Sequence, residues 1–393
     1  MRHGYLATVL DLSLPIGDGQ APARLVGSGV VAAMRALEAR PRLRMEVALC
    51  GAVTLSLLRW GEERCLQMLA ERAAAGQVSF LTTASFGAFL PLVPEAEASR
   101  QLDLCERVNL DALGEVVYRA EGLFPPQLGY SRSVAELALR RGLPRVLADS
   151  LAWHGGAPLP RARHFTLRDR PGMHVFFVDR GLSEGIARGA LCMKEVHHSV
   201  APRASGYAVV RLPPRSLERT GPAFLAALAA SPSVLPASLD DVLALFPEVE
   251  PVEPLASALG TDPAELASGV QFAKWSAPGN ELQALLWRLA QIASAEAARL
   301  EEGSSGSATL GLAALRARLD ESLDCAAWRF ASGKPELDLG RVREGAQRLL
   351  CAVRAGGAQV RRSALAQAEL AYERLERRCA EAALERESSP APA

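Results

Sequence analysis

The chain has 393 residues and carries 44 basic and 44 acidic side chains, so its formal net charge is zero. A balanced charge offers no electrostatic surface of the kind that binds nucleic acid or an anionic membrane, and we expect neither partner. Its 7 cysteines never form a C-x-x-C pair, which favours reduced thiols and a cytoplasmic protein. No apolar run reaches the ~20 residues that a membrane-spanning helix needs.

The first half of the chain alternates short apolar runs with longer helical patterns. The helical patterns at residues 62–75 and 95–113 place apolar residues about 3.6 positions apart. This alternation predicts parallel strands joined by crossover helices, which is an α/β fold. The apolar runs occupy residues 5–14, 44–58, 78–82, 122–124, 145–148 and 174–178.

The second half of the chain changes character after a proline-rich, acidic passage at residues 235–254. From residue 280 onward the sequence is rich in alanine, leucine and arginine. Helices joined by short loops usually pack as a bundle, and we expect four helices at residues 281–302, 310–331, 339–355 and 363–387. The predicted organisation is an α/β domain at 1–255, a helical bundle at 256–387 and a disordered tail at 388–393.

Several motifs follow one another along the chain, and their order indicates a family resemblance. The segment from Gly122 to Ser131 contains the pair Pro126-Gln127, and it follows the apolar-proline segment from Phe89 to Pro94. An apolar strand from His174 leads into Asp179-Arg180-Gly181-Leu182-Ser183-Glu184. Further on, Trp275 precedes Asn280-Glu281 at the start of a long helical pattern. Together these segments resemble glycoside hydrolase family 57.

The resemblance implies a fold and a class of substrate. The implied fold is a distorted (β/α)7 barrel of the glycoside hydrolase and deacetylase type, followed by a C-terminal helical bundle. The implied role is in carbohydrate metabolism, with an α-glucan as ligand. Active sites of such barrels lie at the carboxyl ends of the strands, so chemistry is expected just after each strand.

The positions at which the family carries its functional residues differ in this chain. The family's nucleophilic glutamate is matched by Gln127, and no acid follows the strand at 207–212 before Glu218, although the family has an acid/base aspartate there. The family's His-x-His pair is matched by Asp11 and Ser13. A further histidine and a nearby acidic position of the family are matched by Gly87 and Ser79. These joint replacements predict a pseudoenzyme on a retained scaffold.

The site residues follow from this comparison. We assign no catalytic residue; Asp149 and Asp179, which follow predicted strands, are weak candidates, and Asp179 is equally well explained as a strand-end cap or an ion-pair member. An amide at Gln127 is a far weaker nucleophile than a carboxylate. The residues predicted to bind substrate are Asp11, Ser13, Phe86, Gln127 and Trp275, although aromatic rings such as Trp275 more often serve packing.

No cofactor or metal is expected. The six histidines lack the i, i+4 spacing of a metal-binding helix, and deacetylases with a related barrel use two histidines at a spacing that this sequence lacks. Phosphate-binding loops of the G-x-x-x-x-G-K-[ST] type are also missing.

Three functional hypotheses stay open at this point. The first is a catalytically impaired α-glucan protein that acts by glycan binding or as a scaffold. The second is an active α-glucan hydrolase or 4-α-glucanotransferase that uses relocated carboxylates such as Asp149 or Asp179. The third is an interaction subunit without a glycan role, whose C-terminal helices bind a protein partner.

Overall fold

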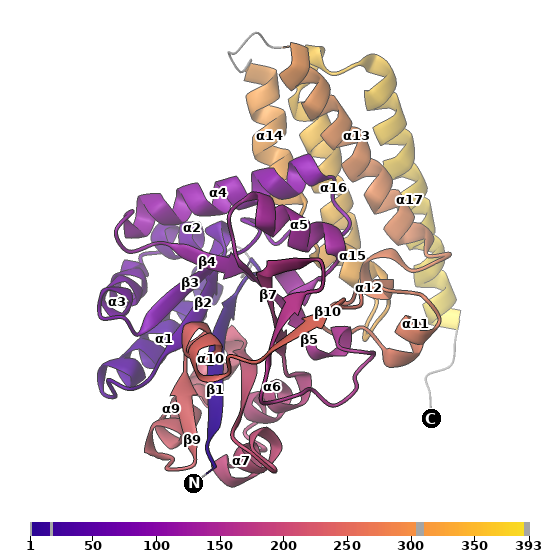
Figure 1. Cartoon of the computed structure of the whole chain (residues 1–393). Coiled ribbons are helices and arrows are strands. Elements are labelled where there is room, and N and C mark those ends of the chain that lie inside the picture. The colour runs from indigo at the N-terminus through magenta and orange to yellow at the C-terminus, as the bar shows by residue number, and fades with distance from the viewer. Residues whose placement is uncertain (1, 16–18, 304–309, 389–393) are drawn as a thin grey trace. The chain divides into compact units, whose positions relative to one another are not determined.

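The computed structural model describes residues 2–15, 19–303 and 310–388. It divides into two compact units, Met1–Leu259 and Gly260–Ala393. Figure 1 shows strands with surrounding helices in the first unit and long helices in the second.

The first unit is a closed barrel of seven parallel strands. The sheet runs in the order β7-β5-β4-β3-β2-β1-β8, and pairing between β7 and β8 closes it. This closure confirms the predicted (β/α)7 barrel. The barrel strands are β1 (Gly4–Leu12), β2 (Met45–Leu49), β3 (Val78–Thr82), β4 (Ala120–Leu123), β5 (Arg145–Asp149), β7 (Arg170–Val178) and β8 (Gly206–Leu212).

Three short strands extend the barrel wall. β6 (His164–Leu167) pairs antiparallel with β7, β10 (Val249–Val252) pairs parallel with β6, and β9 (Val234–Ala237) pairs parallel with β1. The helical elements of this unit are α1 (Gln20–Glu38), α2 (Gly51–Arg59), α3 (Glu63–Ala74), α4 (Glu95–Leu113), η1 (Pro126–Leu128), α5 (Arg132–Arg140), η2 (Ser150–Ala152), α6 (Arg180–Ala187), α7 (Met193–Val200), α8 (Pro214–Arg219), α9 (Gly221–Ala230) and α10 (Leu239–Leu245).

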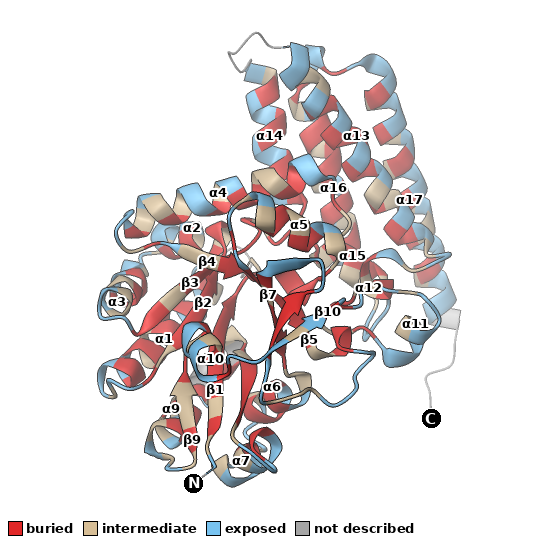
Figure 2. Cartoon of the chain, in the orientation of Figure 1, coloured by how far each residue is buried: buried red, intermediate tan, exposed pale blue. Residues whose placement is uncertain are grey.

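Alternate residues along the strands face the two sides of the barrel wall. One apolar cluster joins strand residues to α1, α2, α3, α7 and α9 and forms the outer core. A second cluster fills the barrel interior with strand residues such as Val9, Ala48, Leu147, Phe176 and Val209, together with α10. Figure 2 shows the strands buried along most of their length, as parallel strands packed on both faces should be.

The alternation also places charged side chains inside the barrel. Because Val9, Leu147 and Val209 point inward, so do Asp11, Asp149 and Arg211, which lie two residues further along β1, β5 and β8. These three positions are at the carboxyl ends of the strands. At the amino ends, the same rule points Glu46 and Arg145 inward.

The second unit consists of helices. Its long members α13, α14, α16 and α17 correspond to the four predicted bundle helices. The helical elements are α11 (Pro263–Ala267), α12 (Ala273–Ser276), α13 (Glu281–Gly303), α14 (Leu310–Ser322), α15 (Ala326–Ala331), α16 (Leu339–Ala355), η3 (Gly357–Gln359) and α17 (Arg362–Ser388). The predicted tail at 388–393 lies outside the described residues, apart from Ser388 at the end of α17.

One apolar run and one predicted helix each contain two elements of the structure. The run at 44–58 holds β2 and most of α2, which begins directly after Cys50; both are apolar because β2 lies in the barrel wall and α2 buries Val53 and Leu57. The predicted helix at 310–331 is divided into α14 and α15. The break lies beside Asp324, whose carboxylate accepts a hydrogen bond from the Ala326 amide at the start of α15 (3.1 Å).

Candidate functional site

The charged residues at the carboxyl end of the barrel are joined in ion pairs. Asp11 accepts a hydrogen bond from the Arg211 guanidinium, with Nη1 2.5 Å from Oδ2. Its other oxygen accepts from the hydroxyl (2.5 Å) and the amide (3.0 Å) of Ser13. Asp11 is 6% exposed and Ser13 is fully buried, so the pair is held in a largely dry environment.

Asp149 lies at the end of β5 and is paired with Arg180, the first residue of α6. The guanidinium contacts both carboxylate oxygens, at 2.9 and 3.2 Å, and the Leu151 amide donates a third hydrogen bond at 2.8 Å. Burial raises the pKa of Asp149, and the positive charges of Arg180 and Arg211 act against that rise. Arg211 therefore influences both buried aspartates.

Asp179 has a structural role in addition to any place at the site. It caps α6 by accepting a hydrogen bond from the Leu182 amide (2.8 Å), and its other oxygen is paired with Arg161. The sequence left a strand-end cap and an ion pair as the alternatives for Asp179; the ion pair occurs, and the residue, which follows β7, caps the start of α6. Arg180, the next residue, is paired with Asp149.

Gln127 lies in η1, directly after β4, in a left-handed backbone conformation with φ 58° and ψ 21°. A non-glycine residue rarely adopts this conformation, and such strain concentrates at functional sites. The main-chain carbonyl of Gln127 accepts a hydrogen bond from the Leu259 amide at 2.6 Å. Within the described part of the chain, its side-chain amide has no hydrogen-bond partner, and the residue is 9% exposed.

Part of the chain matches a known protein family. Residues 31–188 match the family described as glycosyl hydrolase family 57. This segment belongs to that family. It contains Gln127, Asp149 and Asp179, so the resemblance read from the motifs is confirmed where most of the site residues lie. A sequence search of curated proteins finds no significant match.

Three solved structures with this fold are those of a branching enzyme, a 4-α-glucanotransferase and an α-amylase. A family 57-type branching enzyme from Pyrococcus horikoshii superposes with a TM-score of 0.66 at 13% identity, covering 95% of this chain and 94% of its own. A 4-α-glucanotransferase from Thermococcus litoralis gives 0.64 at 12% identity over 90% of this chain, which spans only 60% of that enzyme. An α-amylase from Thermotoga maritima gives 0.62 at 12% identity, with coverages of 95% and 97%. At such identities the likeness shows the fold alone.

The backbone at Gly87, a position that the sequence matched to a family histidine, suits glycine. Gly87, which matches a family histidine, has φ +73°, and a Cβ added there would lie 2.7 Å from Cδ of Pro15. A histidine would therefore require both backbone and Pro15 to move. Ser79, at the position of a family acid, lies in β3 and is half-buried.

The aromatic residues predicted to bind substrate lie in different surroundings. Phe86 is half-buried, and its amide donates to Oε1 of Gln101 (2.9 Å). Trp275 in α12 is fully buried, and its carbonyl accepts from the Trp287 indole at 2.9 Å. A buried ring offers no face to a sugar, so this burial favours packing for Trp275, and its part in substrate binding stays a prediction.

Arg211 and Arg161 were missed by sequence reasoning. Arg211 was read only as part of an apolar strand, yet its position two residues beyond Val209 points it inward. The available signal was the charge itself, because an arginine within a strand buried on both faces needs a partner of opposite charge. Glu218, a remote candidate for the missing acid, lies in α8, and its side chain is outside the described part of the structure.

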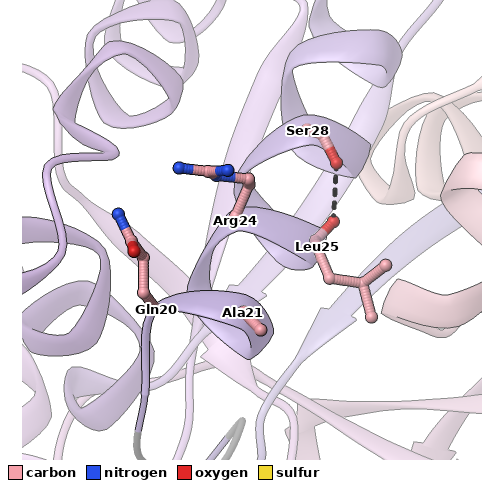
Figure 3. Close-up of a pocket in the computed structure, with 5 residues that line it drawn as sticks. All are labelled: Gln20, Ala21, Arg24, Leu25 and Ser28. Atoms are coloured by element: carbon pink, nitrogen blue, oxygen red, sulfur yellow. Dashed lines mark hydrogen bonds between the residues drawn. The ribbon is translucent and has the colours of Figure 1, made fainter.

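A pocket of about 430 Å³ lies against the first turns of α1. Figure 3 shows its lining: Gln20, Ala21, Arg24, Leu25 and Ser28. None of these side chains is acidic, so the pocket contributes no catalytic candidate. Across residues 2–15, 19–303 and 310–388, no group of three His, Cys, Asp or Glu side chains is arranged to hold a metal. None of the described helices is long and apolar enough to cross a membrane.

Proposed function

We propose that this protein acts in carbohydrate metabolism by binding an α-glucan at the carboxyl end of its barrel without cleaving it. The match of residues 31–188 to family 57 and the α-glucan enzymes among the solved structures with this fold support a glycan as ligand. The proposal places the glycan beside Asp11, Arg211, Asp149 and Arg180.

The observation that carries the proposal is the pairing of each inward-facing aspartate with an arginine. A retaining glycosidase needs two carboxyl groups about 5–5.5 Å apart, one of which attacks the sugar as a free nucleophile. Asp11 and Asp149 already accept short hydrogen bonds from Arg211 and Arg180, which occupy their lone pairs and neutralise their charge. Gln127, at the family's nucleophile position, has no charge to offer.

The same ion pairs suit the recognition of a neutral sugar. Hydroxyl groups both donate and accept hydrogen bonds, and an aspartate-arginine pair presents acceptors and donors side by side. The side chains of Arg180 and Arg211 are 24% and 20% exposed, so part of each guanidinium is accessible to a ligand. The unpaired amide of Gln127 adds one further donor and acceptor.

The experiment is native gel electrophoresis in gels containing glycogen, where binding slows migration. We expect wild-type protein to be retarded and Arg211→Ala to lose at least tenfold in apparent affinity, because the Asp11 pair is broken at the binding position. Arg132→Ala is the matched control: Arg132 is also held in ion pairs, with Asp169 at 2.6 Å and Glu136 at 3.1 Å, but on the surface of α5. Equal migration of wild-type protein with and without glycogen would exclude the proposal.

A second candidate function rests on Asp149. A buried carboxyl group with a raised pKa is the usual form of a general acid in a glycosidase. In this alternative Asp149 donates a proton to the glycosidic oxygen, and the protein turns over α-glucan slowly with relocated groups. Turnover that disappears in Asp149→Asn would support this candidate over a binding protein.

A further inference from the structure

At the amino end of the barrel, opposite the candidate site, a buried glutamate contacts the helix that closes the interior. Glu46 is the second residue of β2 and is 1% exposed. Its Oε1 accepts a hydrogen bond from the amide of Leu239, the first residue of α10, at 2.9 Å. Its Oε2 is buried and has no hydrogen-bond partner among the described residues.

The helix that Glu46 contacts contributes to the interior core. Leu239 and Val242 of α10, and Phe246 directly after it, pack with Ala7, Ala48 and other inward strand residues. Phe246 also contacts the rings of Tyr5 and Tyr207, with centroids 5.7 and 5.2 Å apart. Opening of α10 would therefore expose the apolar core at the amino end of the barrel to water.

The charged groups around Glu46 come from three elements. Arg145 of β5 reaches Asp240 of α10 and Glu121 of β4, the latter at 3.1 Å. Arg145 attracts the Glu46 carboxylate, while Glu121 and Asp240 repel it. Its neighbours in register on β1 and β3, Val9 and Ser79, are uncharged. An ionised Glu46 thus lies near one cation and two anions, and its own Oε2 has no hydrogen-bond donor among the described residues.

We propose that Glu46 is a proton-operated clasp that holds α10 over the amino end of the barrel when it is protonated and loosens it when it is ionised. The protonated carboxyl keeps the hydrogen bond from Leu239 and buries no charge. Ionisation leaves a charged, unpartnered oxygen in the core, which costs free energy that opening of α10 relieves. This device is independent of any glycan role.

The direction of the pH effect follows from linkage. Burial raises the pKa of Glu46 from 4.5 to about 7 in the closed state. In an opened state exposed to water, the pKa returns toward its ordinary value. The closed state then binds more protons between these two values, so opening becomes easier as pH rises through this window and levels off above the higher pKa. These values give about tenfold more opening at pH 8 than at pH 6.

Hydrogen-deuterium exchange of the full chain tests the clasp. Protection factors, corrected for intrinsic exchange, are compared at pH 6 and pH 8 for peptides covering residues 239–246. We expect wild-type protection to fall about tenfold at pH 8 and Glu46→Gln to show no such fall, because the amide retains the acceptor for Leu239 but does not titrate. Glu97→Gln, the same change at another buried glutamate, in α4, should keep the wild-type pH dependence.

Two results would overturn the clasp. One is the same pH dependence in wild type and Glu46→Gln, which would assign the effect to another group. The other is a Glu46 carboxyl that titrates near pH 4.5 in the wild-type protein, measured by carbon-13 NMR with labelled glutamate. The second measurement needs no variant, so it decides the proposal even if Glu46→Gln fails to fold.

Discussion

At the scale of single residues, an ion pair between Asp11 and Arg211 lies at the carboxyl end of the barrel. Asp11 and Arg211 come from neighbouring strands and satisfy each other, so each would be unfavourable alone. Removing one partner of a largely buried pair leaves a charge without compensation. We expect Asp11→Asn and Arg211→Met each to lower the free energy of unfolding by about 2–4 kcal/mol, and the double variant to lose less than the sum of the two.

Chemical denaturation of the four proteins in a double-mutant cycle measures this coupling. Single and double variants that behave additively would show that the pair contributes no mutual stabilisation. In that case Asp11 and Arg211 would not depend on each other at the carboxyl end of the barrel.

The residue scale is also where sequence reasoning was weakest. Gln127, Asp11, Asp149 and Asp179 were found because they sit at motif positions or directly after strands. Their partners were not found, because a pair such as Asp149 and Arg180 depends on which side chains converge in space across the barrel. Parallel strands buried on both faces read as continuous apolar runs, so the inward positions of β8 carried no visible period.

At the scale of elements, the second unit depends on a buried glutamate. The side chain of Glu296 in α13 is fully buried, and its oxygens contact the guanidinium groups of Arg361 (2.5 Å) and Arg299 (3.0 Å) and the amide of Arg361 (3.1 Å). Burial acts to raise the pKa of Glu296, but the hydrogen bonds from Arg361 and Arg299 outweigh it and lower that pKa. This contact fixes the start of α17 against α13.

We expect Glu296→Gln to lower the free energy of unfolding by about 2 kcal/mol at neutral pH, because the buried acceptor loses its charge and one oxygen becomes a donor. The loss should begin to shrink as pH falls below 4.5, because the carboxyl group then takes up a proton in the unfolded chain, and it should disappear once pH falls below the lowered pKa of the folded state. Urea titration at pH 7 and pH 4 measures both effects. Glu344→Gln, in an exposed pair with Arg341, is the control and should change stability by less than about 0.5 kcal/mol. A Glu296→Gln effect no larger than this control would contradict the assignment.

Elements were predicted better than residues because their signals are local. Runs such as 78–82 and 174–178 coincide with β3 and the end of β7, and the long bundle helices were found from their composition. The run at 44–58 was not divided, since hydropathy cannot separate a buried strand from the helix that follows it. The elements α10 and β10 within the passage at 235–254 were missed because four prolines and several acids suggested a linker.

At the scale of the whole molecule, a closed (β/α)7 barrel, of which residues 31–188 match family 57, carries paired charges at its carboxyl end. The core residues of β1, β5 and β8 are those that any barrel of this kind must bury, and they continue directly into Asp11, Asp149 and Arg211. Along one strand, the residues that build the core therefore differ from the residues at its end that can contact a ligand. This separation supports our central claim that the protein engages α-glucan without cleaving it.

Product analysis tests this claim most directly. Purified protein at high concentration is incubated for many hours with malto-oligosaccharides and glycogen, and the products are chromatographed beside those of an active family 57 enzyme and of the Asp149→Asn variant. The account predicts an unchanged substrate profile for wild type and variant alike. Shortened or redistributed chains from wild type, absent with Asp149→Asn, would contradict it and show that Asp149 supports catalysis.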